Sequence, residues 1–258
     1  MVGITSLSTS TLDKNCCNYN SIEDLTNCMQ LSAILLRKSV DKIIFFTDKR
    51  GLKLIESFKH LYDEVVVCLD ELDWVQAHNW AYSKIYVYQY MKEPFLHIDN
   101  DVFLWDRLPS HFYDIEKTDF FFQGKETFEW YSFYKDMIKD NMAILPKIVL
   151  PVSHEYAYNC GVAGFNNLSI LKLYNDLACE YIKENQRRII QINQALMFEQ
   201  WFITKLCEVG KVDFLLHPNL EPIYGTKYTH LPAGSKHHLP NMIQVAKKLE
   251  AYKRVFAK

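Results

Sequence analysis

Long hydrophobic runs are missing from this chain. No segment approaches the roughly 18 consecutive apolar residues that a membrane-spanning helix needs. The first ten residues carry neither a basic segment nor the apolar stretch of a secretory signal. We therefore expect a cytoplasmic protein without a transmembrane segment. Peripheral attachment to the inner face of a membrane through the C-terminal segment stays open.

A large charge of either sign is also missing. The net charge is −2 and the pI is about 6.5, so the chain has no basic field for nucleic acid. The seven cysteines are irregularly spaced without a Cys-x-x-Cys pair, which favours buried thiols in a reducing compartment. The chain also has no glycine-rich phosphate loop. A substrate must therefore be held by individually placed groups.

What the chain does contain is an alternation of short apolar segments and amphipathic ones. Its 258 residues, 49% of them hydrophobic and without a repeat or linker, are enough for one large domain. Apolar runs predict strands at 2–7, 42–46, 64–69, 95–98, 120–123 and 212–216, and helical spacing predicts helices at 21–37, 51–60, 78–92, 168–186 and 190–208. This pattern indicates an α/β fold of three layers with a mixed, mostly parallel central sheet.

The most informative segment is His97–Phe103, at the end of an apolar strand. Alternation along an extended chain puts Asp99 and Asp101 on the same side, with Asn100 turned away. A hard cation such as Mn²⁺ or Mg²⁺ relieves the repulsion between two such carboxylates and keeps coordination positions for phosphate oxygens. A solvated turn is the alternative, since Asp and Asn are common turn residues. The apolar residues that follow favour the metal site.

Three further motifs accompany this segment in a fixed order. The four are Trp80-Ala81-Tyr82-Ser83-Lys84, Phe95 to Phe103, Asn159-Cys160-Gly161 and Glu199-Gln200. Together they resemble the Asp-x-Asp glycosyltransferases of the GT-A (nucleotide-diphospho-sugar transferase) fold. The group that contains glycogenin and the bacterial lipopolysaccharide galactosyl- and glucosyltransferases is similar, and so is a family of poorly characterised bacterial proteins.

The resemblance covers roughly residues 30 to 240 and implies a single GT-A-like domain. It would have a nucleotide-binding half at about 1–110, an acceptor and sugar half at about 111–240 and a C-terminal helix at about 239–258. The aromatic-rich region 112–150 would then supply an acceptor cleft, although core packing explains its aromatic residues equally well.

The resemblance also implies which residues meet a metal and a donor diphosphate. The implied metal ligands are Asp99, Asp101 and His230, and the implied diphosphate contacts are Lys84 and Lys236. The C-terminal histidine, glycine and lysine are spaced differently here than in the related families, so His237 and His238 stay open as alternative ligands. Lys84 has a structural alternative too, as an amphipathic lysine on a half-buried helix face.

A second set of residues is implied at the reacting sugar. Catalytic roles fall to Glu199, Asn159 and Lys84, and further donor contacts to Asn100 and Gln200. The structural alternatives are a surface glutamate on a helix and an asparagine in a turn before a strand. The pair Asn193-Gln194 competes with Glu199-Gln200, which we prefer because its distance to the next strand fits better.

The function that the resemblance implies is a metal-dependent glycosyltransferase of the hexosyltransferase type. The donor would be a UDP-sugar by analogy, the acceptor an unidentified glycan, lipid-linked molecule or protein, and the anomeric configuration would be retained. Two other classes stay open. A non-catalytic carbohydrate- or nucleotide-sugar-binding relative would keep the fold without turnover, and a metal-dependent phosphohydrolase or nucleotidyltransferase also uses paired aspartates.

Overall fold

The computed structural model describes residues 1–13, 19–75, 79–114, 116–127, 156–184, 194–208, 210–215 and 228–256. The chain forms two compact units. Unit 1 consists of Met1–Glu71, His97–Pro109 and Pro222–Lys258, and unit 2 consists of Leu72–Leu96 and Ser110–Glu221. The chain leaves unit 1 twice and returns twice, so segments that are distant in the sequence complete each unit.

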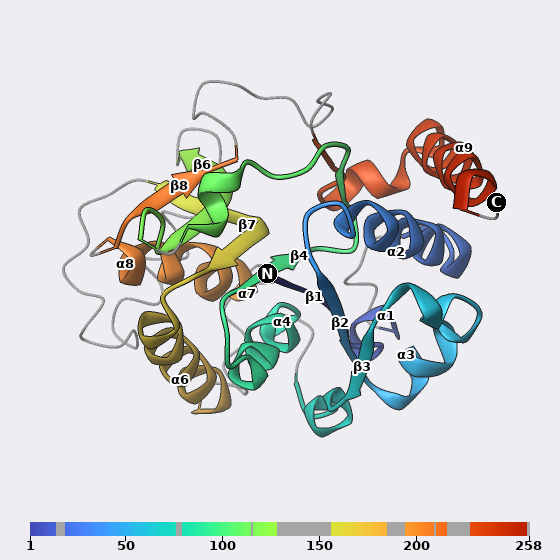
Figure 1. Ribbon diagram of the computed structural model, residues 1–258. Coiled ribbons are helices and arrows are strands. Elements are labelled where there is room, and N and C mark those ends of the chain that lie inside the picture. The colour runs from blue at the N-terminus through green and yellow to red at the C-terminus, as the bar shows by residue number, and fades with distance from the viewer. Residues whose placement is uncertain are drawn as a thin grey trace. The chain divides into compact units, whose positions relative to one another are not determined.

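The first three strands form a parallel array in unit 1 and lie side by side in Figure 1. They are β1 (Val2–Leu7), β2 (Lys42–Thr47) and β3 (Glu64–Val67). The helices that connect or follow them are α1 (Ser10–Asp13), α2 (Ile22–Leu36), α3 (Lys49–Leu54) and the 3₁₀ helices Glu56–Leu61 and Leu69–Leu72. Parallel strands need such crossover connections, because the chain must return to the end of the sheet where the previous strand began.

The core of unit 1 joins the beginning of the chain to its end. Helix α2 starts where the Ser21 hydroxyl accepts a hydrogen bond from the Asp24 amide, at 3.0 Å. Strands β5 (Val102–Leu104) and β9 (Tyr228–His230) pair antiparallel, and the 3₁₀ helix Ala233–His237 and helix α9 (Leu239–Phe256) follow. Their buried residues form one cluster: Cys28, Leu31, Leu35, Phe103, Leu231, Met242, Val245 and Leu249.

Unit 2 contains three paired strands and most of the remaining helices. Strands β6 (Phe120–Thr127) and β7 (Tyr156–Phe165) are antiparallel, and β8 (Val212–Phe214) runs parallel to β6. The helices are α4 (Tyr82–Val87), α6 (Leu168–Glu184), α7 (Gln194–Leu196), α8 (Ile203–Cys207), the 3₁₀ helices Tyr88–Tyr90 and Ser110–Tyr113, and the π-helix Met197–Phe202. Among the described helices of the chain, none combines the length and apolarity that crossing a membrane requires.

Strand β4 (Phe95–Ile98) is completely buried and carries the chain from unit 2 into unit 1. The hydrogen-bonded order of strands is β3-β2-β1-β4-β7-β6-β8, so β4 is an interior strand as its apolar sequence predicts. Of the four pairings given above within this sheet, three are parallel and one is antiparallel. The predicted α/β fold with a mixed, mostly parallel sheet is therefore confirmed.

Three predicted elements differ from the structure. The apolar run at 64–69 forms a strand only over Glu64–Val67, and these residues are half-buried or exposed because β3 ends the strand order. The helix predicted at 51–60 breaks at Phe58, whose φ of −132° is not helical. Within its described residues, the helix predicted at 78–92 is α-helical only over Tyr82–Val87 and has ended before Met91, whose ψ of 132° is extended.

Gly164 offers a test of the packing in unit 2. It lies opposite Phe121 in the β6–β7 pairing, and a Cβ atom at residue 164 would lie 1.8 Å from Phe121 Cε1. We expect Gly164→Ala to lower the free energy of unfolding by about 1–3 kcal/mol, because the buried ring must move. Urea denaturation measures this change. In a Phe121→Leu background the loss should shrink, and an undiminished loss there would contradict the proposed clash.

Candidate metal site and a buried ion pair

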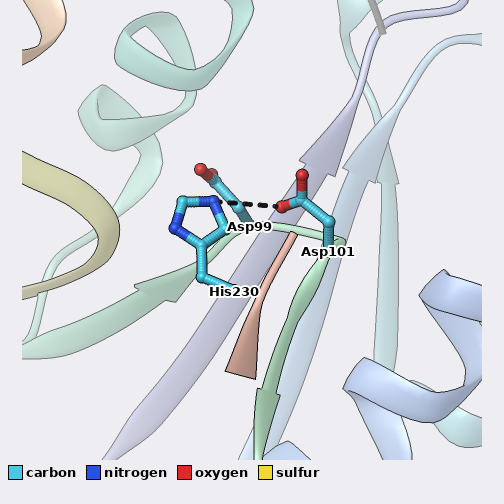
Figure 2. Close-up of side chains that lie close together, drawn as sticks. All are labelled: Asp99, Asp101 and His230. Carbon is cyan, nitrogen blue, oxygen red and sulfur yellow. Dashed lines mark ion pairs between the residues drawn. The ribbon is translucent and has the colours of Figure 1, made fainter. Parts of the chain in front are cut away.

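Two aspartates and a histidine converge in unit 1. Asp99 follows β4, Asp101 ends the turn that leads into β5, and His230 ends β9. One ligand atom from each side chain lies within 4.8 Å of the other two. Figure 2 shows the imidazole ring facing both carboxylates, with the His230–Asp101 contact dashed. The structure thus brings together the three residues predicted as metal ligands.

The pairing of β5 with β9 explains why His230 lies here. In its antiparallel register Val102 is opposite His230, and the Leu231 amide donates to the Asp101 carbonyl at 3.0 Å. The turn before β5 is closed by a hydrogen bond from the Val102 amide to the Asp99 carbonyl, at 3.1 Å. Backbone hydrogen bonds on both sides therefore fix the spacing of the three side chains.

Asn100, between the two aspartates, faces β1. Its side-chain oxygen accepts a hydrogen bond from the Thr5 hydroxyl at 2.7 Å, and its amide nitrogen donates to the Ser6 carbonyl at 2.8 Å. Alternation along the chain predicts that Asn100 turns away from the aspartates, and these contacts are its partners. The contact of Asn100 with the nucleotide-sugar donor, which the resemblance implies, stays a prediction, because both polar atoms of its side chain already bind β1.

Asp101 is the more deeply buried of the two aspartates, with 5% of its surface exposed. Lys236 Nζ lies 2.5 Å from Asp101 Oδ2, and His230 Nε2 lies 3.7 Å from Oδ1. Burial alone would raise the pKa of the Asp101 carboxyl. The charges of Lys236 and His230, with the hydrogen bond from Lys236, outweigh burial and lower that pKa below its usual range. Asp101 is therefore an ionised carboxylate in a mostly buried site.

Asp99 is more accessible. Its side chain is 30% exposed, and His97 Nδ1 lies 3.7 Å from Asp99 Oδ1. Its carbonyl accepts a hydrogen bond from the Ser32 hydroxyl of α2, at 3.4 Å. The site thus has one carboxylate on its buried side and one on its accessible side, which leaves room for ligands that arrive from solvent.

The donor set fits a divalent cation. Two carboxylates and one imidazole suit Mn²⁺, and the carboxylates also suit Mg²⁺, with water or phosphate oxygens completing the shell. The alternative ligands, His237 and His238, are exposed. Their rings make hydrogen bonds to Asn20 and Asn241, at 2.8 and 3.2 Å. Among the described residues, His230 is the histidine that joins the two aspartates.

Unit 2 contains a buried ion pair between Lys84 and Glu199. Lys84 Nζ lies 2.6 Å from Glu199 Oε1 and also donates to the Cys160 carbonyl, at 2.6 Å. The exposed fractions of the two residues are 6% and 4%, so neither structural alternative, a half-buried lysine or a surface glutamate, describes them. Within the described part of the chain, Glu199 Oε2 is buried and has no hydrogen-bond partner. The pair leaves one carboxylate oxygen for another ligand.

A π-helix presents Glu199 to strand β7. The segment Met197–Phe202 interrupts the helical stretch, and such π-turns widen a helix locally. The Cys160 thiol donates to the Glu199 carbonyl at 3.2 Å. The Thr204 hydroxyl donates to the Gln200 carbonyl at 2.6 Å and accepts from the Tyr158 amide at 2.7 Å. The backbone of this segment is therefore tied to β7 through Cys160 and Thr204.

Asn159 lies inside β7 rather than in a turn before a strand. Its side-chain nitrogen donates to Glu126 Oε1 at 2.5 Å, and its oxygen accepts from the Gly161 amide at 2.9 Å. The β6–β7 register shifts between Phe122 and Gly124, and after this bulge Gly124 pairs with Asn159. No local pattern in the sequence indicates Glu126, because its contact with Asn159 depends on that bulge.

Other predicted residues lie outside the described part of the chain. These are most of the aromatic-rich acceptor region, Asn193 of the competing pair, and the side chain of Gln194. The structure brings Asp99, Asp101, His230 and Lys236 together in unit 1, and Lys84, Glu199 and Cys160 together in unit 2.

The chain belongs to a family of unknown function, DUF6734, whose model matches residues 8–256. None of the curated proteins compared with the chain matches it. Family membership therefore brings no assigned activity with it.

Two solved structures of the same fold are similar to this chain. One is the galactosyltransferase LgtC in complex with donor and acceptor sugar analogs, at 11% identity and a TM-score of 0.52, covering 96% of both chains. The other is a putative glucose-1-phosphate thymidylyltransferase from Bacillus anthracis in complex with a sucrose, at 12% identity and a TM-score of 0.50, covering 95% of both chains. The chain has a GT-A-type fold, and enzymes of two reaction classes share it.

The Lys84–Glu199 pair can be tested by a double-mutant cycle. We expect Lys84→Met to lower the free energy of unfolding by about 3–5 kcal/mol, because it leaves a buried carboxylate unpaired. The loss in Lys84→Met/Glu199→Gln should be smaller than the sum of the single losses by about 1–3 kcal/mol. Thermal or urea unfolding measures all three. The exposed Lys92→Met is the matched control, with an expected change below about 0.5 kcal/mol. Additive losses would mean that the two groups do not interact.

Proposed function

We propose that this protein is a metal-dependent glycosyltransferase that moves a sugar from a nucleotide-sugar donor to an acceptor. The observation that carries the proposal is the convergence of Asp99, Asp101 and His230 on a GT-A-type fold. The proposed donor is a UDP-sugar, and the proposed outcome is retention at the anomeric carbon, both by resemblance. The acceptor would be a glycan, a lipid-linked molecule or a protein.

The metal site would bind the diphosphate of the donor. Asp99, Asp101 and His230 would hold Mn²⁺ or Mg²⁺, which supplies electrostatic stabilisation of the leaving nucleoside diphosphate. Lys236 adds a positive charge beside the same carboxylate, and its flexible stem lets the ammonium reach phosphate oxygens. Catalysis needs charges that are in place before the reaction, and the backbone hydrogen bonds around Asp101 supply that order.

The residues of unit 2 have a proposed role at the sugar. In the Lys84–Glu199 pair, Lys84 orients the carboxylate, and the unpartnered Oε2 is the oxygen that would act on a ligand. Asn159 is held by Glu126 and by the Gly161 amide, so its amide plane is fixed. Lys84 is thereby proposed as a positioning residue. The contact of Lys84 with the diphosphate, which the resemblance implies, would require its ammonium to leave Glu199. Gln200 is proposed to contact the nucleotide-sugar donor.

The second candidate function is a nucleotidyltransferase, which the similarity to a thymidylyltransferase of the same fold favours. The two functions differ in the bond that breaks. A glycosyltransferase breaks the bond between the sugar and the diphosphate of a nucleotide sugar and releases a nucleoside diphosphate. A nucleotidyltransferase transfers the nucleoside monophosphate part of a nucleoside triphosphate to a sugar phosphate and releases pyrophosphate. Product analysis therefore separates them.

The binding half of the proposal predicts metal-dependent nucleotide affinity. Calorimetry should show that UDP binds the wild-type protein at least about tenfold more tightly in Mn²⁺ than in chelator, because phosphate oxygens complete the metal shell. Asp101→Asn should reduce the affinity in Mn²⁺ to the level measured in chelator. Asp106→Asn removes an exposed carboxylate of the same unit and should leave both affinities unchanged. Equal affinity in Mn²⁺ and in chelator would remove the metal from the proposal.

The catalytic half predicts turnover of a nucleotide sugar. With a panel of UDP-sugars and Mn²⁺, wild-type protein should release UDP by transfer or by slow hydrolysis. Glu199→Gln should lower the rate with little effect on UDP affinity, because its charge acts at the sugar near the transition state. Release of pyrophosphate from nucleoside triphosphates instead would support the nucleotidyltransferase. Binding without turnover of any donor would support a non-catalytic sugar-nucleotide-binding protein.

A further inference from the structure

We infer that the ammonium of Lys236 binds Asp101 when no metal is present and competes with the metal for this carboxylate. The site would therefore bind the divalent cation together with a diphosphate rather than the cation alone. This inference rests on the proposed function and deepens it. It names the ligand as a metal–diphosphate pair and assigns Lys236 the control of its entry.

The geometry around Asp101 supports the inference. Lys236 Nζ contacts Oδ2 at 2.5 Å, and His230 Nε2 lies nearest Oδ1. The side chains of Lys236 and Asp101 are 12% and 7% exposed, so solvent screens their attraction only weakly. The ammonium also lies 5.1 Å from the centre of the Tyr19 ring. The ammonium therefore holds one oxygen of a carboxylate that a cation would have to coordinate.

The charge of the site points in the same direction. The carboxylates of Asp99 and Asp101 carry two negative charges, and the ammonium of Lys236 already balances one of them. A divalent cation alone would add two positive charges beside a nearly buried ammonium. The diphosphate of a nucleotide sugar carries two negative charges, so cation and diphosphate together restore the original value. The site without ligands and the fully loaded site thus carry the same net charge, and the site with the cation alone does not.

The diphosphate also receives the displaced lysine. A cation that coordinated Asp101 Oδ2 would compete with Lys236 for the same oxygen, and the ammonium would lose its contact with that carboxylate. Phosphate oxygens offer a new partner, which a lysine reaches by rotating its four-carbon stem. The backbone need not move for this exchange, because only the side chain of Lys236 rotates. The Ser235 hydroxyl and amide donate to the Pro232 carbonyl at 2.6 and 3.0 Å and hold the start of the 3₁₀ helix Ala233–His237, which carries Lys236.

The test compares binding of Mn²⁺ alone with binding of Mn²⁺ in the presence of inorganic pyrophosphate or UDP. Calorimetry, or electron paramagnetic resonance of free Mn²⁺, measures both without any turnover. We expect Lys236→Met to bind Mn²⁺ alone at least about tenfold more tightly than wild type, because a competing positive charge is gone. The same variant should lose most of the enhancement that pyrophosphate gives the wild type. Lys236→Gln, which keeps a polar end without the charge, should behave like Lys236→Met.

Two controls separate charge from shape. Lys236→Arg keeps the charge and should bind Mn²⁺ alone as weakly as wild type does. Lys53→Met removes an exposed lysine of the same unit and should change neither affinity. Thermal unfolding of each variant shows that it is folded before binding is measured.

The outcomes distinguish this inference from the proposed function. If wild type binds Mn²⁺ with pyrophosphate or UDP, but the Met and Gln variants bind Mn²⁺ alone no more tightly than wild type, Lys236 is not a competitor and the inference is wrong. In that case the metal site itself stands. If wild type binds Mn²⁺ under neither condition, the proposed metal site fails and the inference falls with it.

Discussion

A buried carboxylate loses its hydration and needs hydrogen bonds or an opposite charge in return, and in each unit a lysine supplies such a charge. In unit 1 the carboxylate of Asp101 is balanced by Lys236, and in unit 2 that of Glu199 is balanced by Lys84. Hydrophobic residues of similar volume would commonly be as stable in such places, and removing one partner alone is costly. Stability alone therefore does not account for these charges, which agrees with the proposed function at a charged ligand.

The supports of the two carboxylates differ in kind. Asp101 lies in a turn whose neighbours are held by backbone pairing between β5 and β9, with Asp99 left accessible beside it. Glu199 lies on a π-turn, with the Cys160 thiol on its carbonyl and the Lys84 ammonium on its side chain. The first arrangement suits an ion that arrives from solvent with its own ligands. The second fixes one carboxylate oxygen, and the other has no hydrogen-bond partner among the described residues.

Local patterns in the sequence predicted much of the fold and part of the site. Alternation after an apolar strand placed Asp99 and Asp101 on one side, and the order of motifs indicated the GT-A-type fold. His230 was found by resemblance, because no local pattern links it to an aspartate more than a hundred residues earlier. The π-turn at Glu199 and the bulge that gives Asn159 its Glu126 partner depend on tertiary packing. Propensity and periodicity do not report such features.

The path of the chain through unit 1 also bears on how the protein is made. Asp99 and Asp101 leave the ribosome well before His230 and Lys236, and the core of unit 1 also includes Met242, Val245 and Leu249 of α9. Until His230 and Lys236 have been synthesised, a nascent chain has two aspartates without these cationic partners. Unit 2, whose segments all precede residue 222, can assemble during that interval. The order of folding during translation would therefore be opposite to the order in which the two units begin in the sequence.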